Sequence, residues 1–288
     1  MKKTVGALLL AALALPAFAS TPVPSGKWRF DFVDPRGRAD RPIRVYSYRP
    51  KACDSRCPIL FVMHGMKRNG ADYRDYWELA ADRHKVLIIA PEFSRQAWPR
   101  AAAYNLGDVA GEADREKWSY SAIEHLFDEM RDGQASYAIF GHSAGGQFVQ
   151  RMAILRPDNR ASVMVAANPG WYLMPEWRKD RTENPYPYSL VNSRAGESEL
   201  RQALARRVIL LVGEQDNDPD DENLDKSAGA MKQGESRVAR GENFFKAATS
   251  AARDLGVKLA WELNEVPDVA HDAATMSRIA AETLYGRK

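Results

Sequence analysis

The stretch YAIFGHSAGG occupies residues 137–146 and decides the fold class of this chain. It begins as a short apolar run, which is typical of a buried strand, and it leads into residues 145–155, whose pattern is typical of a helix. Between the two lies the pattern G-x-S-x-G, with Ser143 at its centre. Such a turn needs glycine at Gly141 and Gly145, because a side chain at either position would clash. The sequence therefore predicts a strand–turn–helix that raises the Ser143 hydroxyl above the edge of a sheet.

An acid and a histidine follow this serine, each after a predicted strand. The apolar run 208–212 leads into Asp216, and the run 258–266 leads to His271. A serine hydroxyl becomes an effective nucleophile when a base accepts its proton, and a carboxylate must hold that base in the correct tautomer. We therefore predict a catalytic triad of Ser143, Asp216 and His271.

The elbow sequence GHSAGG at 141–146 and the chain order serine, acid, histidine carry a family resemblance. The chain resembles the α/β-hydrolase superfamily. In particular, it is similar to the branch of secreted polyhydroxyalkanoate-depolymerase-like and feruloyl-esterase-like serine esterases, over nearly everything after about residue 27. The resemblance implies an α/β fold with a mostly parallel central sheet, helices on both faces and a small lid-like insertion. The resemblance is specific for the fold and the triad but defines the substrate only broadly.

The identity of the acid leaves one alternative open. Asp216 stands three residues after Gly213, at the strand end where this family carries its acid. Asp218 follows two residues later in the same acidic run and is the alternative. The run 216–221 superficially resembles a calcium-binding loop, but Asp221 occupies the EF-hand glycine position and Ser227 the position of the final glutamate. We therefore expect a solvated acidic turn around the triad acid.

Two backbone N–H groups are the candidates for an oxyanion hole. One belongs to Ala144, directly after the serine. The other belongs to Met66, because His64-Gly65-Met66 follows the predicted strand 59–63 and is similar to the family's HG-x segment. Each such donor typically lowers the barrier by ~3 kcal/mol. The following residues 67–70 read KRNG, which differs from the glycine-rich HGGG form and argues against hormone-sensitive-lipase-like esterases.

Strand-like and helix-like runs alternate along one large domain, residues 20–288. We expect antiparallel leading strands at 28–33 and 43–48. Inner strands are expected at 59–63, 86–90, 136–140, 162–166, 208–212 and 258–266. Helices are expected at 73–83, 116–130, 145–155, 241–255 and 273–284. The stripe Ile123, Leu126, Phe127 and Met130 should pack on the sheet, and Gly256 should end a helix.

Two long segments, 91–115 and about 168–206, interrupt this alternation. The second is rich in aromatic residues and prolines, and we interpret it as a lid or pocket wall at the ligand-binding edge of the sheet. An aromatic wall suits an apolar acyl chain or a phenolic ring, so Trp171 and Tyr172 are the candidate substrate-binding residues. The alternative is a surface excursion packed on its own aromatic residues.

The N-terminus carries the parts of a secretory signal peptide, residues 1–19. Lys2 and Lys3 precede an apolar stretch that is short for a membrane span, and small residues follow it. We expect cleavage near Ala19 and a periplasmic or secreted enzyme, the alternative being a retained anchor. Removal of the two lysines lowers the formal charge from +3 to +1, so the overall basicity gives no case for binding nucleic acid or membrane.

Cys53 and Cys57 are the only cysteines. In an oxidising compartment we expect a local disulfide between them, with free thiols as the alternative. No second Cys/His pair lies nearby, so a zinc site is not expected.

The leading functional hypothesis is hydrolysis of carboxylic esters, small or oligomeric, through an acyl-enzyme and without a cofactor or metal. Hydrolysis of peptides or amides on the same fold is the first alternative. A catalytically silent binding protein on a hydrolase scaffold is the second. The sequence predicts neither the length of the acyl group nor the oligomeric state.

Overall fold

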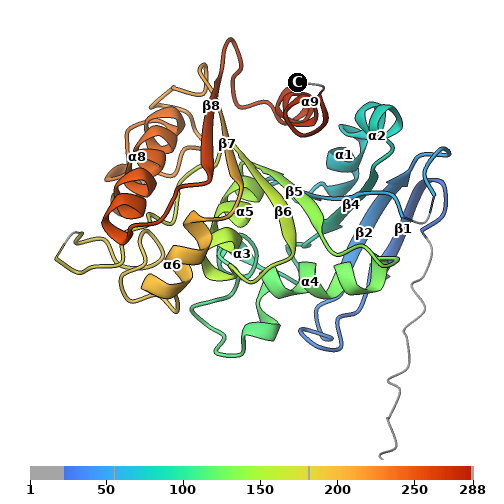
Figure 1. Cartoon of the computed structure of the whole chain (residues 1–288), viewed down its shortest axis with the longest axis horizontal. Helices are drawn as coiled ribbons and strands as arrows, with labels where there is room; N and C mark the ends of the chain where they lie inside the picture. Colours follow the sequence, from blue (N-terminus) through green and yellow to red (C-terminus); the bar gives the residue numbers. More distant parts are fainter. Residues whose placement is uncertain (1–22, 55, 181, 287–288) are drawn as a thin grey trace, which may run out of the picture.

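The computed structural model describes residues 23–54, 56–180 and 182–286. The predicted signal peptide lies outside these residues. Within them, an eight-stranded sheet runs in the order β1-β2-β4-β3-β5-β6-β7-β8 (Figure 1). The strands are β1 (Gly26–Phe32), β2 (Ile43–Arg49), β3 (Ile59–Met63), β4 (Leu87–Glu92), β5 (Tyr137–His142), β6 (Ala161–Ala167), β7 (Val208–Gly213) and β8 (Trp261–Val266). The β1–β2 and β2–β4 pairs are antiparallel and the remaining pairs are parallel, so the predicted mostly parallel α/β architecture is confirmed.

Helices cover both faces of this sheet (Figure 1). The α-helices are α1 (Gly70–Asp75), α2 (Glu78–His84), α3 (Arg100–Ala103), α4 (Ser119–Met130), α5 (Ala144–Leu155), α6 (Glu197–Leu204), α7 (Ala228–Met231), α8 (Arg237–Leu255) and α9 (Ala273–Tyr285), with a 3-10 turn η1 (Arg115–Lys117). Side chains from α4, α5, α6 and α8 build the larger core cluster, and those from α1, α2 and α9 build the smaller one on the other face.

Strand β3 shows why the sheet needs cover on both sides. Phe61 and Met63 lie in the larger cluster, whereas Leu60 and Val62 lie in the smaller one. All four side chains are fully buried. Because side chains alternate between faces of a strand, a run that is apolar at every position is typical of a sheet sandwiched between helices.

Several predicted boundaries are wrong in informative ways. The single helix expected at 73–83 is two helices, α1 and α2, because the chain turns at Tyr76–Trp77 and buries the Trp77 ring against Phe140. The helix expected from 241 begins one turn earlier, at Arg237, where the side chain of Ser236 caps it by accepting from the N–H of Ala239.

Other predictions are confirmed. The stripe from Ile123 to Met130 is buried in the larger core cluster, and Gly256 ends α8 with a left-handed φ of 63°. Cys53 and Cys57 form a disulfide, with their Cα atoms 5.6 Å apart.

The segment predicted as a lid, residues 168–206, connects β6 to β7. It contains α6, which sequence reasoning missed, and an isolated bridge between Met174 and Ser189. Across the described part of the chain, no helix combines the length and apolar character needed to cross a membrane.

Candidate functional site

Ser143 lies at a sharp turn between β5 and α5. Its φ of 58° and ψ of −118° depart from the regions that non-glycine residues favour, which is the strained geometry expected of the G-x-S-x-G turn. Its N–H donates to the carbonyl of Ala167 at 3.0 Å, which ties the turn to β6. A side chain at Gly141 would collide with the carbonyl of Gly145, and one at Gly145 with the carbonyl of Met63. The predicted strand–turn–helix is therefore confirmed, together with the reason for its two glycines.

The structure brings His271 and Asp216 together from two loops at the carboxyl ends of β8 and β7. Nδ1 of His271 lies 2.7 Å from Oδ2 of Asp216. The Asp216 side chain is 3% exposed and the His271 side chain 24% exposed, so the carboxylate is buried while the imidazole reaches the surface. The alternative acid, Asp218, is exposed and accepts from the N–H of Asp220, within its own turn. Of the two acids, Asp216 is the hydrogen-bond partner of His271.

His142 connects the serine turn to this pair. Its ring centroid lies 4.6 Å from that of His271, and its Nδ1 lies 3.2 Å from the hydroxyl of Tyr73. Burial lowers the pKa of His142 well below its usual value, and the nearby charges of His271 and Arg237 lower it further. His142, directly before Ser143, therefore stays neutral and packs against His271. The sequence carries no signal for the contact between His142 and His271.

The loop after β3 lies beside Ser143. A Cβ atom at Gly65 would sit 3.7 Å from the Cβ atom of Ser143. His64 anchors this loop: its Nε2 accepts from the N–H of Phe93 at 3.0 Å, so the proton sits on Nδ1, which lies 2.9 Å from the carbonyl of Gly65. Burial lowers the pKa of His64 to about 3, so the ring remains neutral. His64 therefore supports the loop that follows β3.

The two residues predicted to form an oxyanion hole occupy different surroundings. Ala144 is the first residue of α5, where a helix leaves its N–H groups without intrahelical acceptors. Met66 has a side chain that is half exposed, and its carbonyl accepts from Nη2 of Arg95 at 2.8 Å. The backbone of Met66 is thus held in the loop whose Gly65 adjoins Ser143.

Asn168 joins the loops that carry the acid and the histidine. Its Oδ1 accepts from the N–H of Gly213 at 2.8 Å, and its Nδ2 donates to the carbonyl of Ala270 at 3.1 Å. A side chain at Gly213 would collide with the carbonyl of Val269, so the close approach of these loops requires glycine there. These contacts give Asn168 an architectural role.

The two candidate aromatic residues differ in what surrounds them. Trp171 is 6% exposed, and it packs between the ring of Tyr188, at 4.8 Å, and the guanidinium of Arg151, at 4.1 Å. Tyr172 is fully buried and stacks on Phe244 at 4.5 Å. In this structure the ring of Tyr172 belongs to the core and offers no surface to a ligand.

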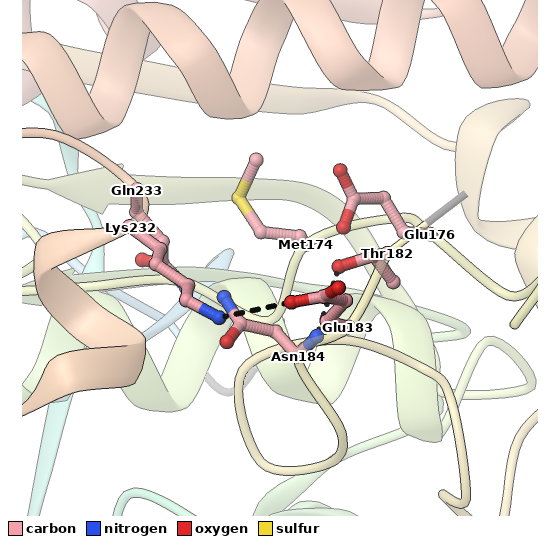
Figure 2. Close-up of a pocket in the computed structure, with 7 residues that line it drawn as sticks. All are labelled: Met174, Glu176, Thr182, Glu183, Asn184, Lys232 and Gln233. Atoms are coloured by element: carbon pink, nitrogen blue, oxygen red, sulfur yellow. Dashed lines mark hydrogen bonds and ion pairs between the residues drawn. The ribbon is translucent and has the colours of Figure 1, made fainter. Parts of the chain in front are cut away.

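A cavity of about 300 Å³ opens beside the segment predicted as a lid (Figure 2). Figure 2 shows Lys232 reaching toward Glu183, with which it forms an ion pair at 3.8 Å. The cavity is lined by Met174, Glu176, Thr182, Glu183, Asn184, Lys232 and Gln233. None of them belongs to the serine turn or to the predicted triad.

Comparison with known proteins places this arrangement in a family, although no protein-family model matches the chain. Poly(aspartic acid) hydrolase-1 from Sphingomonas sp. KT-1 is 37% identical, with a TM-score of 0.85 over 92% of this chain and 100% of that one. LpqC, a poly(3-hydroxybutyrate) depolymerase from Bordetella parapertussis, is 36% identical, with a TM-score of 0.84 over 92% of each chain. An S-formylglutathione hydrolase (FrmB) from Staphylococcus aureus shares the fold at 13% identity, with a TM-score of 0.55 over 90% of this chain and 97% of that one.

Identity above one third over nine tenths of the chain, together with the mostly parallel eight-stranded sheet, is sufficient to assign the family. The chain belongs to the α/β-hydrolase superfamily, in its polyhydroxyalkanoate-depolymerase-like branch of carboxylic ester hydrolases.

Proposed function

We propose that this protein is a serine hydrolase that cleaves carboxylic esters through an acyl-enzyme, with Ser143 as nucleophile, His271 as base and Asp216 as the acid that orients it. The observation that carries the proposal is the hydrogen bond of 2.7 Å between His271 Nδ1 and Asp216 Oδ2, next to a strained serine turn. Because Nδ1 is engaged by the carboxylate, Nε2 is the nitrogen left to accept the proton of the serine.

The chemistry follows from these roles. Ser143 Oγ attacks the ester carbonyl carbon while His271 Nε2 takes the hydroxyl proton. The tetrahedral intermediate then collapses, the C–O bond to the alcohol breaks, and His271 returns the proton to the departing oxygen. A water molecule, deprotonated by the same imidazole, attacks the acyl-enzyme. The bond between the acyl carbon and Ser143 Oγ then breaks, His271 gives the proton to Oγ, and the acid is released.

Negative charge develops on the carbonyl oxygen during both attacks. The N–H groups of Ala144 and Met66 are the proposed donors to this oxygen. The start of α5 supports the first, since the end of a helix dipole favours negative charge. The close approach of Gly65 to Ser143, where an added Cβ atom would lie 3.7 Å from the serine Cβ, supports the donor at Met66. Main-chain donors of this kind are already oriented before the reaction begins, which is why they lower the barrier.

The substrate class rests on the two relatives. One is named for poly(3-hydroxybutyrate), a polyester, and the other for poly(aspartic acid), whose units are joined by amide bonds. We favour esters of hydroxy acids, small or oligomeric, with amide hydrolysis as the second candidate because of the relative named for poly(aspartic acid). Trp171 is the proposed contact for the acyl group. For Tyr172, whose ring is buried, a contact with substrate would require the segment 168–206 to move.

We further propose that the enzyme acts in the periplasm or outside the cell. The N-terminal sequence has the composition of a signal peptide, and a disulfide such as Cys53–Cys57 persists in oxidising compartments. Fusion of residues 1–19 to a reporter enzyme that is active only after export would test this. A reporter that stays inactive would contradict it.

The proposed reaction is tested by covalent labelling. A fluorophosphonate probe should label the wild-type protein and the control Ser198→Ala, whose serine lies exposed on α6. It should not label folded Ser143→Ala. Hydrolysis of 3-hydroxybutyrate oligomers, chromogenic esters of graded acyl length and aspartate oligomers would then separate ester from amide cleavage. Folded wild-type protein that takes up no label would refute the proposal and favour a binding protein on a hydrolase scaffold.

A further inference from the structure

A buried arginine lies against the carboxylate of Asp216. Nη1 of Arg237 donates to Oδ1 of Asp216 at 2.9 Å, so each carboxylate oxygen has its own partner, Arg237 on one and His271 on the other. Nη2 of the same guanidinium donates to Oδ1 of Asp221 at 3.1 Å. The side chains of Arg237 and Asp216 are each 3% exposed, which screens their pairing from water.

The charges of Arg237, Asp216 and Asp221 stabilise one another. Burial opposes the charged form of Arg237, but Asp221 and Asp216 together raise its pKa, so the guanidinium stays positively charged. The hydrogen bond from Arg237 lowers the pKa of Asp221, and the charge of His271 lowers it further. Two carboxylates and one guanidinium therefore present a net charge of about −1 to the imidazole, where two carboxylates alone would present about −2.

We propose that Arg237 is a positioning residue of the hydrolytic reaction, which holds the Asp216 carboxylate in the orientation that receives His271 and sets the charge that the imidazole faces. This inference rests on the proposed function. A carboxylate with one free oxygen can rotate about its Cβ–Cγ bond, and the second hydrogen bond prevents that rotation. The guanidinium suits this task because its planar donors reach two carboxylates at fixed angles.

Arg240, one turn further along α8, shows what a purely architectural arginine does in the same helix. Its guanidinium donates to the backbone carbonyls of Gly170, Asp225 and Gly234 at 2.7 to 2.9 Å. It is fully buried, like Arg237, but its hydrogen bonds hold loops together and do not reach the triad carboxylate. Arg240 is therefore the matched control for Arg237.

The other groups around Asp216 and His271 define the direction of the expected pH effect. His142 packs on His271 from β5 and stays neutral, and Tyr172 faces Asp216 from the segment after β6 with its pKa raised by burial and by that carboxylate. Asp268 and Asp272 lie in the His271 loop and are exposed. Against this background, loss of Arg237 leaves more negative charge facing the imidazole and stabilises its protonated form. Loss of the Asp221 charge has the opposite effect.

The test is the pH dependence of kcat/KM on a chromogenic ester. Arg237→Gln should raise the midpoint of the acid limb by about one unit or more, as expected for unit charges a few ångströms apart, and should lower kcat about tenfold or more. Arg237→Lys, which keeps the charge, should restore the midpoint but only part of kcat. Asp221→Asn should shift the midpoint downward. Arg240→Gln should lower the melting temperature and leave the midpoint unchanged.

Unchanged midpoints in Arg237→Gln and Asp221→Asn would overturn the inference. If Arg237→Gln does not fold, Asp221→Asn and Arg237→Lys decide the question, because the Asp221 side chain is partly exposed and the lysine keeps the charge. The proposed function is tested separately. If Ser143→Ala retains wild-type turnover, the triad is refuted, whatever the Arg237 variants show. An inactive Ser143→Ala with unshifted Arg237 and Asp221 variants refutes only the positioning role.

Discussion

Nδ1 of His271 lies 2.7 Å from Oδ2 of Asp216, although 55 residues separate them in the chain. This hydrogen bond discriminates between the two acids that the sequence offers. Asp218 lies only two residues beyond Asp216, yet its carboxylate is exposed and serves its own turn. A pair of single substitutions can therefore test which of them orients the imidazole.

We predict that Asp216→Asn lowers kcat by a factor on the order of 10⁴, because an amide in this place favours the wrong tautomer of the histidine. Asp218→Asn, the matched control, should stay within about twofold of wild type, as is usual for an exposed surface substitution. Steady-state kinetics on a chromogenic ester would measure both. Comparable losses in the two variants, or a larger loss in Asp218→Asn, would contradict the assignment of Asp216.

Catalysis should depend on the neutral form of His271. Because a base must be neutral to accept the serine proton, kcat/KM should fall as the pH is lowered. His271→Ala should lower turnover by orders of magnitude while the melting temperature stays near that of wild type. A rate that remains flat down to about pH 4.5 would exclude this histidine as the base, and a parallel loss of folding would assign it a structural role.

Stability should decline in acid because of His64. Its pKa is lowered to about 3 by burial, so the folded state resists a proton that the unfolded chain accepts near the ordinary value of 6.5. The stabilising contribution is therefore complete above about pH 6.5 and is lost as the pH falls toward 3, by up to about 1.4 kcal/mol per pH unit. His142, whose pKa is also lowered, acts in the same direction.

Denaturant unfolding between pH 4 and 7 would measure this slope in wild type and in His64→Gln, which can still accept from the N–H of Phe93. The slope should be shallower in His64→Gln. In the control His84→Gln, whose half-buried ring lies on the other face of the sheet against Tyr285, the slope should match wild type. Equal slopes in all three proteins would show that His64 does not contribute.

Gly145→Ala should destabilise the fold or displace the serine turn, since the added methyl group meets the carbonyl of Met63. Buried overpacking of this kind typically lowers the free energy of unfolding by about 1–3 kcal/mol. Gly111→Ala is a control for the change in residue type, because a Cβ atom there meets only Oδ1 of Asp108, at 3.4 Å. Thermal unfolding and esterase activity would be compared, and an unaffected Gly145→Ala would contradict the tight approach of α5 to β3.

Elements with strong local signals could be predicted from the sequence alone. The apolar runs of β3 and β7 were predicted within one residue, because fully buried strands leave a continuous hydrophobic pattern. The serine turn could be predicted equally well. Its glycines are required because a side chain at Gly141 would meet the carbonyl of Gly145, and one at Gly145 the carbonyl of Met63 in the neighbouring strand. The order of serine, acid and histidine in the chain indicated the fold class without any tertiary contact.

The side chains that contact Asp216, and the two loops that Asn168 joins, could be identified only from the folded structure. Arg237 carries no sequence signal for its contact with Asp216, and it lay outside the helix predicted from residue 241, because the cap at Ser236 was missed. The hydrogen bonds of Asn168 to Gly213 and Ala270 likewise join loops that are far apart in the chain. Local sequence patterns indicate whether a segment forms a strand or a helix. The contacts of Arg237 and Asn168, in contrast, form only after the parallel strands have brought their carboxyl ends to one edge of the sheet.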